Sequence, residues 1–346
     1  MLIYGLSRIK RGVSKLKGFI SPGPLVLLYH RVTHLYNDPH FLAVTPENFE
    51  AHLQVLRQYY HVISLSDMIK KISNGESLRN LITITFDDGY SDNAKMAFPL
   101  LQKYRLPAMF YLASGFVGSH YEQYHDELER LLFFPSKSID KISINIGGSL
   151  YEWALNIEKT DKSLATSKLI WNVETKYNFS PLVRIYCEIL AILKESTPIK
   201  REAVLEELRR QCGDSGQART THRGMSWDHA RMMSKSHLID FGVHTVNHPY
   251  LSNLSFNLQK SEIITSKSKI EEEIDKSLSS FAYPFGTCKS YTSETVALLK
   301  NMGFTNSCSN FTGRICRSTD LFQIPRFVVR DWSGDEFHRQ ILNAHL

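Results

Sequence analysis

The sequence predicts an α/β fold in which helices cover a parallel β-sheet. Three observations support this: short apolar runs of strand length, helical patterns between them, and turn residues at several run ends. Strands that alternate with helices favour parallel pairing, in a sheet that is open or closed into a barrel. Because active groups in such folds lie at the carboxyl ends of the strands, polar residues there are the first candidates for function.

Seven apolar runs have the length and composition of buried strands. The first, Leu25–Tyr29, follows a turn-forming Ser-Pro-Gly-Pro segment, and Leu81–Phe86 is rich in β-branched residues and stops at Asp87. The remaining runs are Ala108–Leu112, 238–243, 281–283, 304–308 and 324–329.

Helical patterns lie between these runs. One helix is predicted to begin at Thr45, a threonine N-cap that precedes a proline and an acidic residue. A second is predicted over 257–277, where apolar residues recur near helical spacing.

The stretch from about 118 to 222 breaks the alternation of strands and helices. It contains helical patterns over 126–133 and 203–210 and a β-like piece over 142–151. We interpret it as a mainly helical insertion, which caps the active site, recognises the substrate, or only packs against the core.

The composition is that of an ordinary globular protein, with 346 residues, 42% hydrophobic and 22% charged. This length holds one large domain, or a core domain with an insertion. The net charge of +6 is spread along the chain without a concentrated basic stripe, so we expect no nucleic-acid partner. A weakly basic surface still favours an anionic glycan or a membrane face.

We divide the chain into a basic leader, 1–22, and a catalytic domain, 23–346, that carries the insertion. The leader lacks the uninterrupted apolar stretch and small-residue cleavage site of a signal peptide, and no window approaches the roughly 18 apolar residues of a membrane span. It is either a solvated segment or a short amphipathic helix that touches a membrane surface. We therefore expect a cytoplasmic or peripheral membrane protein rather than a secreted one.

The five cysteines form no CxxC pair and no even-numbered framework, so we expect free thiols in a reducing compartment. Cys308 and Cys316 are close enough in sequence to form a disulfide if the protein is exported.

Two carboxylates, Asp87 and Asp88, follow the run Leu81–Phe86. A turn at Gly89 can bring both to one site, so that one binds a metal while the other moves a proton. Taken alone, the pair is equally explained as a helix N-cap with a second acid near the helix dipole.

Two histidines, His244 and His248, follow the run over 238–243. Their spacing of four lets both face one point, although such a pair by itself is more often structural. Together with a carboxylate from another strand end, they form a two-histidine, one-carboxylate set that leaves positions open for water and substrate. The combination favours a divalent metal site.

A third strand end carries the turn residues Pro284 and Gly286 around Phe285. A rigid turn there can aim a backbone N–H at an oxyanion, and its aromatic rings can form the floor of a sugar site.

The ordered segments TFDDGY (85–90), HTVNH (244–248) and YPFG (283–286) resemble the polysaccharide deacetylase family, the NodB-like enzymes of carbohydrate esterase family 4. The opening YHRV (29–32) is similar to the start of one branch. The resemblance runs from about Leu25 to Phe337, interrupted by the insertion. It implies a distorted (β/α) barrel and a metal-dependent hydrolase that removes N-acetyl, or sometimes O-acetyl, groups from glycans.

The resemblance also implies roles for individual residues. Asp87 matches the catalytic base, and Phe285 the backbone oxyanion donor. Asp88, His244 and His248 match the ligands of a divalent ion, for which we expect zinc, with cobalt or nickel as alternatives. The expected substrate-binding residues are Tyr90, Tyr283, Pro284, Arg326 and Trp332.

The chain departs from the family pattern at two places. Ala282 stands where many members have an arginine that braces the catalytic aspartate, and Arg326 or Arg330 is a candidate replacement. The late motif that supplies the general acid is missing, and Asp331-Trp332 is only a partial match to the other late motif. The candidates for the acid are His30, His338 and His345. We favour His30 because it ends the first predicted strand, against the alternative of a structural histidine.

We therefore expect a hydrolase of carbohydrate metabolism that de-N-acetylates a polysaccharide, oligosaccharide or glycolipid during cell-surface polysaccharide biosynthesis. The alternatives are an O-acetyl esterase that acts on a glycan and a glycan-binding protein with a decayed site.

Overall fold

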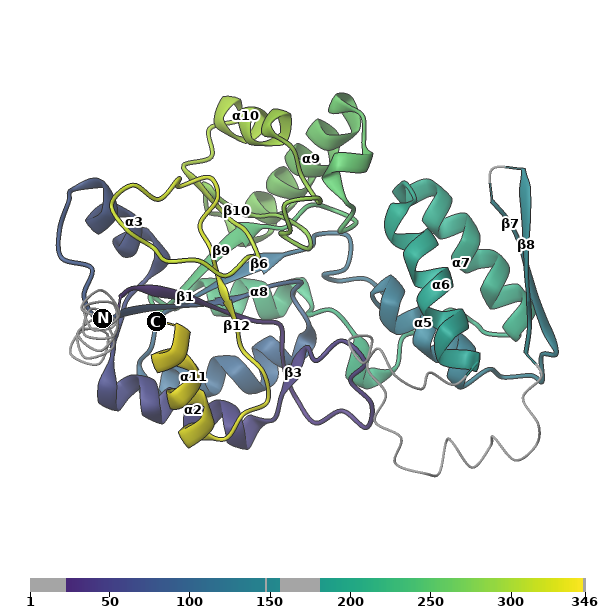
Figure 1. The fold of residues 1–346 in the computed structure, drawn as a ribbon, viewed down its shortest axis with the longest axis horizontal. Helices are drawn as coiled ribbons and strands as arrows, with labels where there is room; N and C mark the ends of the chain where they lie inside the picture. Colours follow the sequence, from purple (N-terminus) through teal and green to yellow (C-terminus); the bar gives the residue numbers. More distant parts are fainter. Residues whose placement is uncertain (1–22, 147, 156–180, 345–346) are drawn as a thin grey trace, which may run out of the picture.

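The computed structural model describes residues 23–146, 148–155 and 181–344. The expected leader, 1–22, and His345 lie outside these residues. Figure 1 shows a larger unit built around a sheet, with a smaller unit of helices and a hairpin beside it.

The larger unit is built on one parallel sheet with the strand order β11-β10-β9-β6-β5-β1-β12, in which β4 also pairs with β5. Every pairing in it is parallel, as the alternation of strands and helices predicts. The strands are β1 (Leu25–Tyr29), β4 (His61–Val62), β5 (Leu81–Phe86), β6 (Ala108–Leu112), β9 (Ile239–Val243), β10 (Ser280–Ala282), β11 (Asn306–Cys308) and β12 (Phe327–Val328). A small separate sheet pairs β2 (Arg31–Val32) with β3 (Ala43–Val44).

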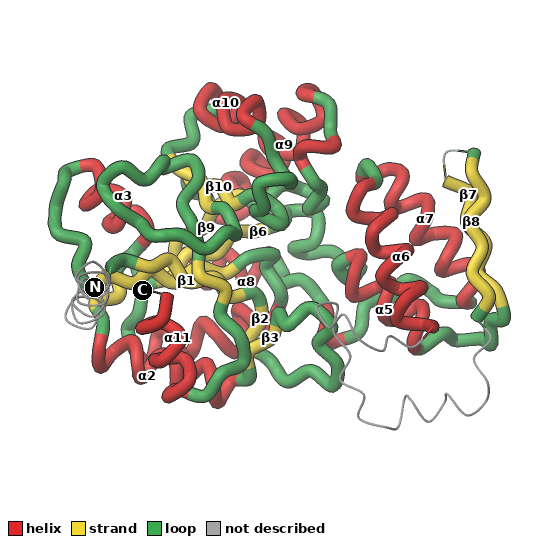
Figure 2. Tube along the Cα trace, in the orientation of Figure 1, coloured by secondary structure: helices red, strands yellow, loops and turns green. Residues whose placement is uncertain are grey.

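The central strands are buried along their whole length, because helices and loops cover both faces of the sheet (Figure 2). The helices of the larger unit are α2 (Pro46–Tyr59), α3 (Leu65–Ser73), α4 (Phe98–Tyr104), α8 (Trp227–Ser234), α9 (Phe256–Ile274), α10 (Ser293–Asn301) and α11 (Gly334–Ala344). A π-helical turn (Asn93–Ala97) leads into α4. Among the described helices, none has the length and apolar character needed to span a bilayer.

The last predicted run, 324–329, forms only a two-residue strand. Its first residue, Ile324, bridges Cys308 at one edge of the sheet, while Phe327 pairs with Leu27 of β1 at the other edge. This segment therefore spans the gap between the two edges and curls the sheet into the distorted (β/α) barrel expected from the motifs.

The register of the sheet aligns the carboxyl ends of its strands. Tyr29 at the end of β1 lies opposite Phe86 of β5, which in turn lies opposite Phe110 of β6. Leu112 of β6 lies opposite Val243 of β9. The residues that directly follow these strands are therefore brought to one edge, which we call the carboxyl edge.

The smaller unit contains α5 (Tyr124–Phe133), the antiparallel hairpin β7 (Lys141–Ile146) and β8 (Ser149–Ala154), α6 (Pro181–Glu195) and α7 (Pro198–Cys212). These elements pack around an apolar cluster of their own, which includes Leu128, Ile189 and Leu208. Phe285 of the larger unit packs against this cluster. The smaller unit therefore contacts the carboxyl edge directly.

Candidate active site

Three side chains at the carboxyl edge form a group with the donor types of a metal site. Asp88 follows β5, and His244 and His248 follow β9; one ligand atom from each lies within 4.8 Å of the others. The Nε2 atoms of both histidines are 3.5 Å from Asp88 Oδ1, which is buried and has no hydrogen-bond partner within the described part of the chain. We call these residues the metal cluster.

The spacing of the metal cluster fits an ion better than direct hydrogen bonds. A separation of 3.5 Å is long for an N–H···O bond. Two ligands held about 2.1 Å from a tetrahedral ion lie about 3.4 Å apart. A buried carboxylate oxygen without a partner is costly, and a divalent ion at this point would satisfy it.

The orientation of His244 is set by its second ring nitrogen. Nδ1–H donates to the carbonyl oxygen of Ala282 at 2.7 Å. Because a carbonyl only accepts, the neutral ring carries its proton on Nδ1 and turns the Nε2 lone pair toward Asp88.

The protonation states of Asp88 and His248 also suit a cation. Burial opposes ionisation of Asp88, but the neighbouring His244, His248 and His30 outweigh it and hold the pKa of this carboxyl well below its ordinary value. Burial lowers the pKa of His248 to about 3, so its ring is neutral near neutral pH. An ionised carboxylate facing a neutral imidazole is the state that binds a divalent ion.

The loops that carry these side chains adopt left-handed backbone conformations. The φ angles of Asp88, Thr245, His248 and Phe285 are 71°, 66°, 50° and 62°. Such conformations cost energy in residues other than glycine, and they concentrate where function requires a particular side-chain direction. Here all four lie at the carboxyl edge.

Close packing between neighbouring loops supports this geometry. The amide of Gly115, just after β6, donates to the carbonyl oxygen of Val246 at 3.0 Å. A Cβ at Gly115 would lie 2.8 Å from that oxygen, so only glycine permits the approach. The Glu262 carboxylate accepts from the amides of Val246 and Asn247 and holds the loop from the other side.

Asp87 is held by an arginine from the far end of the chain. Arg326 Nη1 and Nη2 donate to the two Asp87 oxygens at 2.7 and 2.6 Å, and Nε donates to the Ser309 carbonyl at 2.7 Å. Burial raises the pKa of Asp87, but Arg326 and His244 outweigh it and keep this carboxyl ionised at neutral pH. Arg326 therefore occupies the bracing position for which it was one of two candidates. Arg330 does not, since it donates to the carbonyls of His40 and Phe41.

His30 lies at the same edge and is partly exposed. Burial lowers its pKa, although the Asp88 and Asp87 carboxylates act in the opposite direction, so the ring is close enough to sense both. His338 is not part of the site, because it stacks on Tyr59 at a ring-centroid distance of 4.4 Å.

The structure places most of the expected substrate-binding residues in buried positions. Arg326 is buried against Asp87, and Tyr90 is fully buried with its hydroxyl donating to Asp126 at 2.8 Å. Tyr283 is fully buried and donates to the Phe322 carbonyl at 3.0 Å.

Two further expected contacts also lie in packed positions. Pro284 is buried, and Trp332 packs against the core while its carbonyl contacts His52 Nε2 at 2.6 Å. The neighbouring Asp331 accepts from the amide and hydroxyl of Thr45. In the turn after β10, only Phe285 presents a partly exposed ring, 4.6 Å from the ring of His248.

Three partly exposed residues near the metal cluster were not found from the sequence. His40 lies in the loop before β3, His125 on α5, and Lys194 on α6. The His40 and His125 rings are 5.0 Å apart, and the Lys194 ammonium lies 5.7 Å from the centre of the Phe285 ring. No short motif contains them, so no sequence signal identified them.

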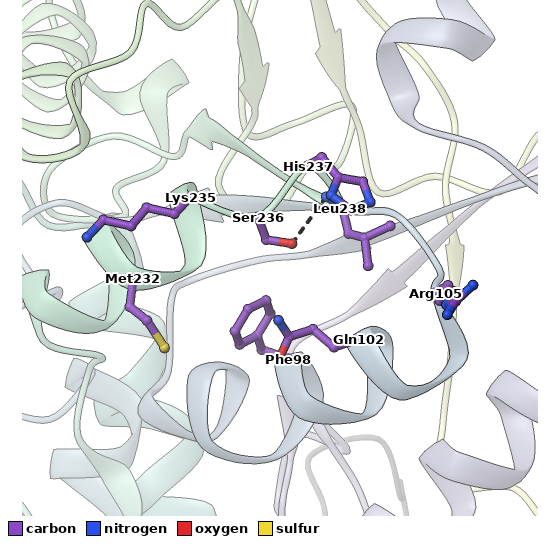
Figure 3. A pocket seen from close by; sticks show the side chains of 8 residues that line it. All are labelled: Phe98, Gln102, Arg105, Met232, Lys235, Ser236, His237 and Leu238. Carbon is purple, nitrogen blue, oxygen red and sulfur yellow. Dashed lines mark hydrogen bonds between the residues drawn. The ribbon is translucent and has the colours of Figure 1, made fainter.

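A surface hollow of about 710 Å³ lies elsewhere, between α4 and the segment that joins α8 to β9 (Figure 3). Leu238 lines the hollow, and its carbonyl accepts a hydrogen bond from the amide of Ala108, the first residue of β6. The hollow therefore lies at the amino ends of β6 and β9. The opposite edge carries the metal cluster, so we do not assign the chemistry to this hollow.

Comparisons with known proteins agree with this architecture. A family model described as polysaccharide deacetylase matches residues 74–134 and 210–307, on both sides of a stretch that contains most of the smaller unit. The Bacillus subtilis (strain 168) protein YxkH, whose name places it among polysaccharide deacetylases, is 25% identical over 126 residues. That match covers 35% of this chain and 44% of YxkH.

Solved structures show the same fold over most of the chain. The Streptococcus pyogenes deacetylase PplD has a TM-score of 0.56 at 15% identity and covers 92% of this chain and 99% of its own. IcaB from Ammonifex degensii has a TM-score of 0.57 at 17% identity and covers 94% and 98%. The chain is therefore similar to polysaccharide deacetylases in two segments of its sequence and in its fold.

Proposed function

We propose that this protein is a metal-dependent carbohydrate deacetylase that removes N-acetyl groups from a polysaccharide, oligosaccharide or glycolipid. One observation carries the proposal: the metal cluster lies beside a second carboxylate, Asp87, which Arg326 keeps ionised and fixed in place. The match to the polysaccharide deacetylase model supports a glycan as the substrate.

The donor set of two imidazoles and one carboxylate suits zinc, with cobalt or nickel as alternatives. Asp88, His244 and His248 would hold the ion. When bound, a zinc-group ion supplies Lewis acidity, which brings the pKa of water to about 7 and polarises a carbonyl.

The remaining roles belong to residues around the metal cluster. Asp87 accepts the proton of the attacking water at its carboxylate, and Arg326 holds that carboxylate in one orientation. The Phe285 N–H makes no hydrogen bond within the described part of the chain, so it is free to donate to the oxyanion. His30, partly exposed at the same edge, donates a proton to the departing amine. The products are acetate and an amino sugar.

The test is acetate release from N-acetylglucosamine oligomers by the zinc-loaded protein. Asp87→Asn should lower the rate by about 10²–10⁴-fold, the range for loss of a general base. Asp240→Asn is the control, because Asp240 is an exposed acid on β9. Full activity of Asp87→Asn would refute the assignment of the base.

The substrate panel should also include O-acetylated glycans. If acetate is released only from the O-acetylated glycans, the protein is an O-acetyl esterase rather than an N-deacetylase. Glycan binding without acetate from any substrate would support a decayed site. We further propose a role in cell-surface polysaccharide biosynthesis, with a cytoplasmic or peripheral membrane location; fractionation of cells that express the full chain tests the location.

A further inference from the structure

The smaller unit brings to the rim of the active site a lysine that has no counterion among the described residues. Lys194 lies in the last turn of α6 and is only partly exposed. Its ammonium is 5.7 Å from the centre of the Phe285 ring, and that ring is 4.6 Å from the ring of His248. Phe285 therefore lies between Lys194 and the metal cluster.

The other buried cations of the smaller unit show that Lys194 is unusual. Three arginines form ion pairs with buried glutamates; these are Arg130, Arg209 and Arg219, with partners among Glu122, Glu127 and Glu129. Arg201 donates to the carbonyls of Leu193 and Asn247. Lys194, by contrast, has neither a hydrogen bond nor an ion pair with any residue that the structure describes.

A charge withdrawn from water is normally paired, because its desolvation is costly. Burial lowers the pKa of Lys194, with no carboxylate among the causes that act on it. Within the described part of the chain, no carboxylate therefore compensates for the burial of this ammonium group.

The surroundings of Lys194 offer a further hydrogen-bonding group, His40. Burial, and after it the nearby His125, Lys194, Arg330 and His30, hold the pKa of His40 well below its ordinary value, so its ring is neutral. Its Nε2 is 2.7 Å from the Tyr186 hydroxyl, which ties it to α6. Asp126 and Asp38 also lie near, but they are engaged by the Tyr90 hydroxyl and by backbone amides, respectively.

We propose that Lys194, His40 and the Phe285 ring form an anion-binding subsite beside the metal cluster, which selects glycans that carry a carboxylate or phosphate on or next to the acetylated sugar. The proposal rests on the proposed function, since it concerns the substrate of the same site. The ring supports the sugar face while the ammonium binds the anion. The smaller unit thereby contributes to substrate choice.

The test measures dissociation constants by calorimetry with the zinc-loaded full chain, at low and at high salt. The three probes are a neutral N-acetylglucosamine tetramer, a tetrasaccharide that alternates N-acetylglucosamine with glucuronate, and UDP-N-acetylglucosamine. The acetate in the calorimeter's sample cell is quantified after each titration. We expect at least one anionic probe to bind about tenfold more tightly than the neutral one at low salt, and the advantage to shrink at high salt.

Three variants separate a specific contact from a general charge effect. Lys194→Met keeps an apolar stem over Phe285 and should remove the preference for the anionic probe, whereas Lys194→Arg should keep it. Lys200→Met removes an exposed charge from the neighbouring α7 and should change nothing. A preference for glucuronate identifies a carboxylate, and one for the nucleotide sugar identifies a phosphate.

The proposal is overturned if neither anionic probe binds better than the neutral one, or if Lys194→Met and Lys200→Met have equal effects. Binding and acetate release are read separately. Tighter binding of an anionic probe without acetate release would support the subsite and refute the deacetylase. Acetate release with equal binding of anionic and neutral probes would support the deacetylase and refute the subsite.

Discussion

Replacing Arg326 tests how the Asp87 carboxylate is held. The guanidinium makes two charge-assisted hydrogen bonds with Asp87, at 2.7 and 2.6 Å, and the exposed fractions of the two residues are 1% and 3%. Arg326→Met leaves a buried carboxylate without a partner. Breaking a buried pair in this way costs about 3–5 kcal/mol in the free energy of unfolding, a large share of the stability of a typical domain.

The assay is urea unfolding of the chelated protein, so that metal binding does not mask the effect. Arg339→Met is the control, since Arg339 is a 69% exposed partner of Glu336 on α11 and should contribute about 0–1 kcal/mol. Adding Asp87→Asn to Arg326→Met removes the unpaired buried charge. The double variant should therefore recover part of the free energy of unfolding that Arg326→Met loses.

The pH dependence gives a second check. The pKa of Asp87 in the folded protein is below its unfolded value, so the stabilisation by the pair is present above the unfolded pKa of about 3.9. It is lost as the pH falls through the lower, folded-state value. The difference between the wild type and Arg326→Met should therefore be largest near neutral pH and shrink in acid. The reasoning would be refuted if Arg326→Met lowered the free energy of unfolding only as much as Arg339→Met does. It would also be refuted if the effect of Arg326→Met did not change with pH.

Three further predictions concern the metal, the loop that carries it, and a second buried acid. His244→Ala and His248→Ala should each abolish the one zinc-group ion per chain that elemental analysis is expected to find; retention in both would argue against the cluster. Gly115→Ala should weaken zinc binding, because the new Cβ would lie 2.8 Å from the Val246 carbonyl; unchanged affinity in a competition titration would contradict this. Burial raises the pKa of Asp126 to about 6, so stability should fall by about 2–3 kcal/mol as the pH rises from the unfolded value toward 6. Asp126→Asn should remove that dependence in unfolding titrations, and an unchanged profile would show that another group is responsible.

The sequence by itself determined the central strands and the metal cluster. The runs Leu25–Tyr29, Leu81–Phe86 and Ala108–Leu112 form strands with the predicted bounds, because a parallel sheet buried on both faces requires continuous apolar runs. Asp88, His244 and His248 lie in the loops that follow β5 and β9, and the parallel register brings these two loops to one edge. Such features are local and can be read from neighbouring residues.

The remaining parts of the site depend on contacts between distant segments. Arg326 reaches Asp87 across 239 residues, only because the segment before β12 crosses from one edge of the sheet to the other. Lys194 reaches Phe285 because the smaller unit packs against the turn after β10. Tyr90 and Tyr283, expected to bind substrate, are buried, and their hydroxyls donate to partners from other segments. Tertiary packing decides burial and partners, and a linear pattern of residue types does not contain that information.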